Sequence, residues 1–319
     1  MVNAKGKTES SAISKKKRRE QVWKRIMRDR VLYFILLIPI IYLVIFKYVP
    51  MAGNILAFRK FKVGGSMFGI KWEGFKYFQL FITDTYFWQV FINTLILSVL
   101  NLIFGFPIPI ILALLLNEVK NKTGKRVVQT ITYLPKFLST VVVVSMLQTL
   151  LSPSTGAINM FLNKFGIDSI YFLNEISWFR PVYIISDIWQ FMGWNSILYL
   201  TALTNVDPQL YEAAAIDGAG RWKQTLYVTI PGILPTIVIT LILSTGSVLS
   251  VGFEKVLLLY TANTMEIADV ISTYTYRMGI VNSQYSYTTA VGLFQGIINL
   301  IIITVVNQIS RKTSETSLW

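Results

Sequence analysis

The stretch D-P-Q-L-Y-E-A-A-A-I-D-G-A-G-R-W-K-Q-T-L-Y-V-T-I-P-G-I-L-P, from Asp207 to Pro235, combines the signals of a helix, a tight turn and a second helix. Asp207 suits a helix N-cap, and Pro208 suits the first helical position, where a backbone N–H has no partner anyway. Gly218 can take the left-handed conformation that ends a helix. We therefore expect one helix before Gly218, a second after it, and a break at Pro231, which lacks a backbone donor.

This stretch lies in a chain with the composition of a membrane protein. Of its 319 residues, 53% are hydrophobic and only 14% are charged, and the mean hydropathy is +0.53. Soluble domains carry about 25% charged residues. An apolar excess of this size indicates that lipid surrounds much of the folded chain.

Six apolar runs are long enough to cross a bilayer, which takes about 20 residues at about 1.5 Å each. They do not alternate apolar and polar residues as the strands of a membrane β-barrel do. The sequence therefore predicts an all-α polytopic membrane protein with six transmembrane helices in one domain, residues 31–319. The predicted spans are Val31–Tyr48, Val90–Leu116, Val128–Leu151, Pro181–Leu203, Gly232–Gly252 and Tyr287–Ile309.

Basic residues cluster between Lys15 and Arg30, directly before the first apolar run. Such a cluster can bind nucleic acid, but before a membrane span it more often marks a cytoplasmic flank. We expect residues 1–30 to form a basic cytoplasmic tail and an amphipathic helix on anionic lipid. The same rule places residues 117–126, residues 207–231 and the C-terminus in the cytoplasm.

The connection between residues 49 and 89 departs from this rule, because it is expected outside and yet is basic. Its aromatic residues are expected to form a belt at the membrane interface, with stacking on a saccharide as the alternative. The basic residues are Arg59, Lys60, Lys62, Lys71 and Lys76, and the aromatic ones include Trp72, Phe75, Tyr86 and Trp88.

The chain contains neither cysteine nor histidine. Disulfides, Cys/His metal sites and imidazole catalysis are therefore excluded. The sequence also lacks the G-x-x-x-x-G-K-[ST] pattern that cradles nucleotide phosphates. We expect no cofactor in this chain, so a process driven by ATP would need an ATPase on another polypeptide.

Within the opening stretch, seven positions form the order E-A-A, glycine, then apolar-x-apolar-proline. This order resembles the signature loop of ATP-binding-cassette (ABC) importer permeases, with valine where the family usually has isoleucine. The surrounding I-D-G-A-G resembles carbohydrate-uptake permeases related to those of maltose transporters. Phe46–Gly53 and Glu266–Gly279 resemble the oligosaccharide and polysaccharide branch. The seven positions are Glu212, Ala213, Ala214, Gly218, Val228, Ile230 and Pro231.

This resemblance implies a type I ABC importer fold and a permease that is not itself an enzyme. The partners would be a second homologous permease, two ATPase subunits that bind ATP and Mg, and an extracellular lipid-anchored sugar-binding protein, in a bacterial cytoplasmic membrane. Residues 207–231, named here the coupling loop, would dock into a cleft on an ATPase subunit. Its candidate residues are Glu212, Ala213, Ala214, Asp217, Gly218 and Pro231.

Polar residues inside two predicted spans are candidates for the path of an oligosaccharide. Asp187, Gln190 and Trp194 share one helix face at i, i+3 and i+7, and Gln295 and Asn299 share another at i, i+4. Carboxylates and amides hydrogen-bond sugar hydroxyls, and tryptophan stacks on sugar rings. The alternative is that these residues hold helices together.

Two other functions compete with import driven by ATP. An ion-coupled secondary transporter needs buried ionisable residues, and the predicted spans offer little beyond Asp187, with Lys136 near the inner end of the third. A membrane-embedded sugar or lipid transferase needs converging carboxylates, whereas Asp207, Glu212 and Asp217 do not share a helix face. Neither alternative explains the coupling loop, and the sequence does not name the sugar.

Overall fold

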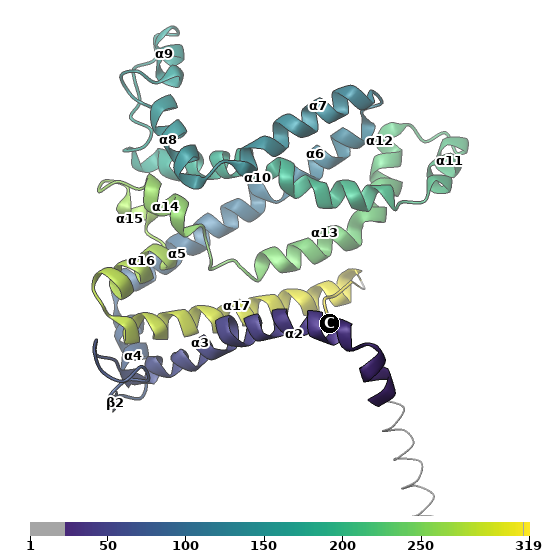
Figure 1. Ribbon diagram of the computed structural model, residues 1–319. Coiled ribbons are helices and arrows are strands. Elements are labelled where there is room, and N and C mark those ends of the chain that lie inside the picture. The colour runs from purple at the N-terminus through teal and green to yellow at the C-terminus, as the bar shows by residue number, and fades with distance from the viewer. Residues whose placement is uncertain (1–22, 315) are drawn as a thin grey trace, which may run out of the picture.

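Helices make up nearly all the regular structure of residues 23–314 and 316–319, which the computed structural model describes (Figure 1). The first half contains α2 (Arg30–Leu43), η1 (Val44–Tyr48), α3 (Val49–Met51), η2 (Ala52–Phe58), β1 (Arg59–Lys60), β2 (Lys71–Trp72), α4 (Lys76–Thr83), α5 (Thr85–Leu100), η3 (Asn101–Gly105), α6 (Pro107–Glu118), α7 (Lys122–Tyr133), η4 (Leu134–Phe137), α8 (Thr140–Leu150) and α9 (Ala157–Asn163). The second half contains α10 (Ile176–Thr204), α11 (Pro208–Ile216), α12 (Arg221–Gln224), η5 (Thr225–Thr229), α13 (Ile230–Thr245), α14 (Phe253–Leu259), α15 (Met265–Ala268), α16 (Ile271–Tyr276), η6 (Arg277–Val281) and α17 (Tyr285–Ser314).

Four continuous helical runs in the described residues are long and apolar enough to cross a membrane. Each overlaps one of the predicted spans. α10 contains a fifth predicted span and is 29 residues long, but its sequence includes Arg180 and Asp187 and it is not among the four. The four runs are Arg30–Phe58, Thr85–Glu118, Arg221–Thr245 and Tyr285–Thr313.

The predicted span Val128–Leu151 is not one straight helix. α7 with η4 and then α8 meet at an angle of 102°, and they count as one further span only if the bent pair crosses together. Pro135 lies in η4, and Leu138 is extended, with φ −76° and ψ 137°. Ser139 then caps α8 by accepting a hydrogen bond from the Val142 N–H at 3.3 Å. The predicted span is therefore divided into two helices, because the Ser139 cap starts a new helix inside the apolar run.

The predicted break at Pro231 was also wrong, because the helical run continues from Arg221 to Thr245. A proline inside an α-helix clashes with the carbonyl four residues earlier. Here a π turn, which is one residue wider, stands directly before it, and Ile230 N–H bonds the carbonyl of Thr225. The same arrangement occurs at two other prolines. Pro50 lies two residues after the π turn η1, and Pro107 lies two residues after the π turn η3, as Pro231 does after η5.

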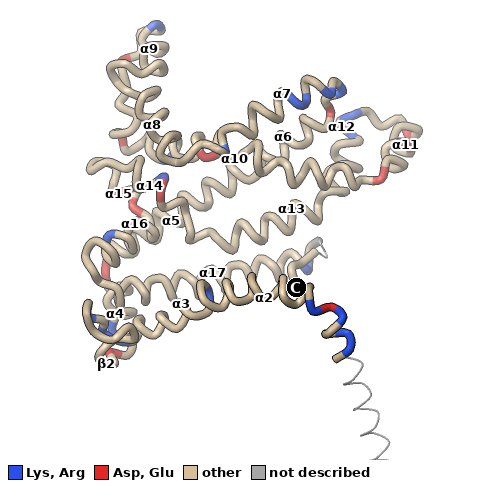
Figure 2. Tube along the Cα trace, viewed as in Figure 1, with Lys and Arg blue, Asp and Glu red and all other residues tan. Residues whose placement is uncertain are grey.

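The charged residues gather mainly at the two ends of the helix assembly (Figure 2). One end holds α7, α11, α12 and the C-terminus, and the other holds α4, β2 and α16. Most of the predicted amphipathic helix lies outside the described residues, although residues 23–28 are helical. The side chains of Trp23 and Met27 there are exposed.

α7 and α10 cross at Gly193, where no side chain fits. A Cβ atom at Gly193 would lie 2.1 Å from the carbonyl oxygen of Thr132 on α7. We expect Gly193→Ala to lower the free energy of unfolding by about 1–3 kcal/mol, because the crossing would have to open. Thermal unfolding of the purified protein in detergent measures this.

Gly292→Ala on α17 is the matched control, since a Cβ there meets nothing within 4 Å. Removing a flexible glycine from an open helical position should leave the protein as stable or slightly more stable. Equal unfolding temperatures for the two variants would contradict the proposed role of the close crossing.

Candidate functional site

The coupling loop has the helix–turn–helix geometry that its sequence predicts. The Asp207 carboxylate caps α11 by accepting a hydrogen bond from the Gln209 N–H at 2.9 Å. Gly218 has a φ of 75°. The N–H groups of Gly218 and Ala219 bond the carbonyls of Ala215 and Ala214 at 3.1 and 2.8 Å, which closes α11 with a Schellman turn.

Side-chain contacts fix α11 against the helix that follows. The Tyr211 hydroxyl donates to Thr229 Oγ1 at 3.0 Å, and Gln224 Nε2 donates to the Ala219 carbonyl at 2.9 Å. Arg221 lies 3.8 Å from Glu118 at the end of α6. The loop is therefore held in place, although it projects from one end of the molecule (Figure 1).

The outer surface of this loop is exposed and has no partner among the described residues. Ile216 and Trp222 are 87% and 80% exposed, which is unusual for large apolar side chains. Glu212 and Asp217 are exposed and belong to none of the ion pairs of the described residues. Two acidic groups beside exposed apolar side chains form a surface suited to a partner protein.

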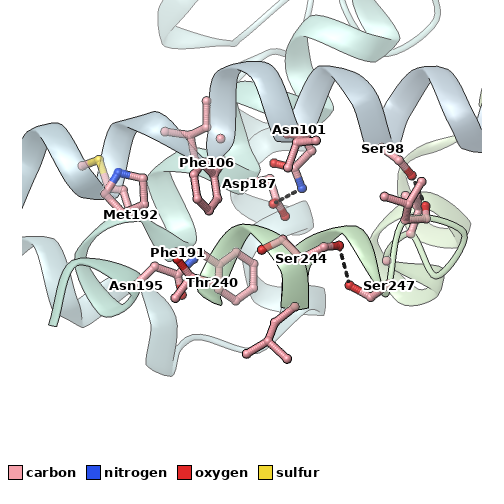
Figure 3. Close-up of a pocket in the computed structure, with 18 of the residues that line it drawn as sticks. Ser98, Asn101, Phe106, Asp187, Phe191, Met192, Asn195, Thr240, Ser244 and Ser247 are labelled. Carbon is pink, nitrogen blue, oxygen red and sulfur yellow. Dashed lines mark hydrogen bonds between the residues drawn. The ribbon is translucent and has the colours of Figure 1, made fainter. Parts of the chain in front are cut away.

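A cavity of about 590 Å³ has three walls (Figure 3). One wall is formed by α5, η3 and α6, the second by α10, and the third by α13 and the residues that follow α13. Its lining mixes apolar side chains with hydroxyl and amide groups. Such a lining can hydrogen-bond a polyhydroxylated molecule without binding a fixed charge. The polar lining residues are Ser98, Asn101, Tyr183, Asp187, Asn195, Tyr199, Thr240, Ser244, Ser247 and Ser250.

Asp187 is the acidic group of this lining, and its charge is balanced locally. Lys255 Nζ on α14 lies 3.2 Å from one carboxylate oxygen, and Asn101 Nδ2 donates to the other at 3.2 Å. The Lys255 side chain is only 5% exposed. A buried lysine requires such a counter-ion, so this pair joins α10 to α14 at the cavity wall.

The structure divides the five candidate path residues into two groups. Asp187 and Trp194 line the cavity, and Asp187 lies in the middle third of α10. Gln190, Gln295 and Asn299 instead bond the backbone of neighbouring segments. Their partners are the carbonyl of Leu138 at 3.3 Å for Gln190, the carbonyl of Leu249 at 2.6 Å for Gln295 and the N–H of Leu249 at 3.3 Å for Asn299.

Sequence reasoning missed Asn101, Lys255 and the hydroxyl groups of α13. Asn101 interrupts an apolar run, and an isolated amide there is a signal that could have been used. Lys255 lies three residues beyond the predicted span Gly232–Gly252, so a search for polar residues inside the spans passes over it. In residues 23–314 and 316–319, no three acidic side chains converge in a way that could hold a metal ion.

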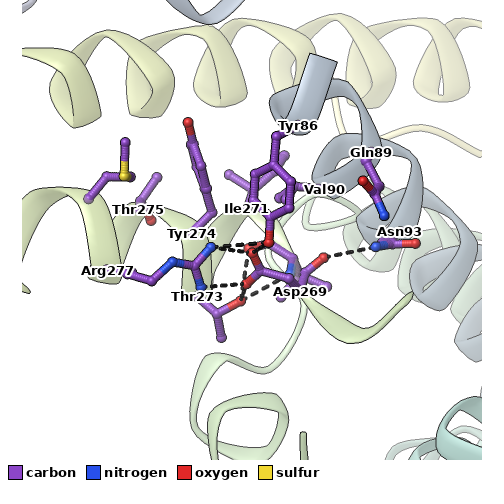
Figure 4. Close-up of polar contacts among 12 residues, drawn as sticks. Tyr86, Gln89, Val90, Asn93, Asp269, Ile271, Thr273, Tyr274, Thr275 and Arg277 are labelled. Atoms are coloured by element: carbon purple, nitrogen blue, oxygen red, sulfur yellow. Dashed lines mark hydrogen bonds and ion pairs between the residues drawn. The ribbon is translucent and has the colours of Figure 1, made fainter. Parts of the chain in front are cut away.

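A second polar cluster fastens the Glu266–Gly279 segment to α5 (Figure 4). Asp269 is 1% exposed and accepts hydrogen bonds from the Tyr86 hydroxyl at 2.6 Å and Thr273 at 2.7 Å. Arg277 bonds both of its carboxylate oxygens, at 2.5 and 3.3 Å. Asn93 on α5 donates to the Glu266 carbonyl at 2.8 Å. These contacts attach the Glu266–Gly279 segment to α5 and so stabilise the fold.

Comparisons with known proteins give consistent matches. The family described as binding-protein-dependent transport system inner membrane component matches residues 105–315. The polygalacturonan/rhamnogalacturonan transport system permease protein YteP of Bacillus subtilis (strain 168) is 43% identical over 309 residues, covering 97% of this chain and 96% of its own length.

Two solved structures are similar along nearly the whole chain. One is a bacterial alginate ABC transporter in complex with an alginate pentasaccharide-bound periplasmic protein, with a TM-score of 0.85, 45% identity and coverage of 93% of this chain and 100% of that one. The other is a bacterial ABC transporter involved in import of the acidic polysaccharide alginate, with a TM-score of 0.85, 45% identity and coverage of 92% and 99%.

Proposed function

The chain belongs to the family of binding-protein-dependent transport system inner membrane components, and we propose that it carries oligosaccharides or polysaccharide fragments that contain uronic acids. It is a membrane-embedded permease of an ABC importer and not an enzyme. The observation that carries the substrate class is the identity of 43–45% to permeases named for polygalacturonan and alginate, over more than nine-tenths of the chain.

The cavity is consistent with this substrate class. Its hydroxyl and amide groups suit sugar hydroxyls, and Trp194 offers an aromatic face for a sugar ring. Because Lys255 neutralises Asp187, the wall has no unbalanced negative charge that would repel a uronate. An ion-coupled transporter would use such a buried pair for coupling, but the permeases that resemble this chain belong to ABC systems.

In the proposed assembly, this chain forms half of the pore beside a second homologous permease. Six helices cross the membrane, with α10 and the bent α7–α8 pair added to the four apolar runs, and both termini lie in the cytoplasm. The coupling loop contacts one of two ATPase subunits, which bind ATP and Mg. An extracellular lipid-anchored binding protein delivers the sugar, and Glu212, Ala213, Ala214, Asp217, Gly218 and Pro231 contribute to the ATPase contact.

The substrate class can be tested on the reconstituted complex of both permeases, the ATPase and the binding protein. Oligogalacturonate and alginate oligosaccharides are compared with maltooligosaccharides as stimulators of ATP hydrolysis. Stimulation by the uronate chains alone is the expected result. Equal stimulation by maltooligosaccharides would contradict the uronate preference.

The role of the cavity makes a separate prediction. We expect Trp194→Ala to reduce sugar uptake about tenfold, because covering most of a large apolar side chain with a ligand contributes about 1.5–3 kcal/mol. Trp189→Ala is the matched control, since Trp189 is on the same helix, is similarly exposed and does not line the cavity. Equal uptake by the two variants would exclude Trp194 from the path.

A further inference from the structure

The basic connection that departs from the positive-inside rule forms an ordered structure, residues 59–76, named here the basic hairpin. β1 and β2 pair antiparallel, with Arg59 opposite Trp72. The Trp72 ring stacks on Phe58 at 5.8 Å. Ser286, at the start of α17, donates to the Arg59 carbonyl at 2.6 Å and accepts from the Phe61 N–H at 2.9 Å. The basic hairpin is thus fixed to the ends of η2 and α17.

Its charge is strongly positive and only partly balanced. Five basic residues and one acidic residue, Glu73, give residues 59–76 a net charge of +4. Glu73 lies 3.4 Å from both Lys71 and Lys76, and the hydrogen bond from Lys76 lowers its pKa. Lys60 and Lys62 are exposed and belong to none of the ion pairs of the described residues. Their charges are available to an anion.

Large apolar side chains lie beside these lysines and are also exposed. Lysine heads next to exposed apolar and aromatic groups are the composition that favours a membrane interface, where the rings enter the headgroup layer and the ammonium groups reach phosphates. A soluble loop of this length would bury such residues. The exposed fractions are 68% for Val63, 82% for Met67, 50% for Phe68, 53% for Ile70, 62% for Trp72 and 67% for Phe75.

The position of the basic hairpin fits this environment. It directly follows the helical run Arg30–Phe58, in which Ala57 is the only buried residue. That run of 29 residues is about 43 Å long at about 1.5 Å per residue, which matches a bilayer of about 40–45 Å with its headgroups. With Arg30 at one headgroup layer, Arg59 and the residues that follow lie at the other. Figure 2 shows basic positions beside β2 and α4, at the opposite end of the molecule from α7 and α12.

We propose that the basic hairpin is a binding site for anionic phospholipid in the leaflet opposite the coupling loop, with Lys60 and Lys62 contacting lipid phosphates. This contact fixes the depth of the helical run Arg30–Phe58, which is packed against the protein mainly through η2 at the end next to the basic hairpin. The proposal does not depend on which sugar is transported.

The 319-residue chain can report this contact because it contains no cysteine. Met67→Cys, labelled with a fluorophore, is placed in nanodiscs of phosphatidylcholine with increasing phosphatidylglycerol and a fixed amount of headgroup-nitroxide lipid. Quenching should rise with the phosphatidylglycerol fraction. Adding K60Q and K62Q should raise the fraction needed for half-maximal quenching at least about fivefold, because each lysine near an anionic surface contributes about that factor.

The matched control removes the same charge at the other end of the molecule. K120Q with K122Q, in the labelled background, should leave the titration unchanged, since Lys120 lies in the turn after α6 and Lys122 is the first residue of α7. Quenching that ignores phosphatidylglycerol, or equal shifts for both double variants, would overturn the proposal. A third outcome would also overturn it. If the label responds to oligogalacturonate in lipid-free detergent, and K60Q with K62Q removes that response, the occupant of the basic hairpin is a saccharide.

Discussion

Replacing Glu212 with lysine is expected to reduce sugar-stimulated ATP hydrolysis and uptake at least about 30-fold, since losing one partner of a desolvated interface ion pair costs about 2–5 kcal/mol. The Glu212 carboxylate is exposed on α11 and belongs to none of the ion pairs of the described residues, and the proposed ATPase contact would give it a counter-charge. Uptake into vesicles and co-purification of the ATPase measure the loss. The amount of permease in the membrane should not change.

Glu118→Lys is the matched control for this charge reversal. Glu118 is also exposed at this end of the molecule, and its contact with Arg221 at 3.8 Å is a surface pair. Such pairs contribute about 0–1 kcal/mol, so transport should fall by less than about fivefold. If Glu118→Lys and Glu212→Lys had the same effect, the charge of the whole surface rather than Glu212 would govern docking.

Substitutions at the turn of the coupling loop provide a second, independent test of ATPase docking. Gly218 has a φ of 75° but open space around its Cα, so the conformation and not a clash limits substitution. Gly218→Asn should keep coupling, because asparagine visits the left-handed region, whereas β-branched Gly218→Val should not. Normal ATPase association with Gly218→Val would contradict a docking role that depends on this turn.

The sequence predicted the coupling loop well because its determinants are local. A cap at Asp207 and a left-handed Gly218 act within a few residues, so no distant contact could override them. The apolar runs were predictable for the same reason. The break at Pro231 was wrong because its effect depends on the width of the preceding turn, and the residues of η5 give no local sign that this turn is a π turn.

The cavity could be predicted only in part, since its walls come from distant segments. Asp187 was identified because an ionisable side chain is energetically costly in an apolar helix. Its partner Lys255 could not be identified in this way, since it is 68 positions away in the sequence. The functions of Gln295 and Asn299 could not be assigned because both reach the backbone of Leu249, which no sequence pattern places near α17. Polar residues in a span mark contacts without telling whether the partner is a ligand or the protein.

The buried cluster around Asp269 makes the second large prediction, on stability. Asp269→Ala is expected to lower the free energy of unfolding by about 3–5 kcal/mol, because Arg277 loses the carboxylate that balances it in a mostly buried site. Thermal unfolding in detergent measures this, and Asp168→Ala, at an exposed position, is the control that should leave stability unchanged.

The double variant Asp269→Leu with Arg277→Met separates a charge effect from a packing effect. Removing both charges leaves no unpaired ion, so the double variant should recover much of the stability that Asp269→Ala loses. A double variant as unstable as Asp269→Ala would mean that the loss comes instead from the Tyr86 hydroxyl, whose acceptor among the described residues is Asp269. Recovery would establish that the Glu266–Gly279 segment, whose sequence resembles the oligosaccharide branch of the family, preserves the attachment of α16 to α5. The resemblance in this segment would then reflect a shared fold contact, and the specificity for a sugar would have to come from the cavity and from the partner subunits.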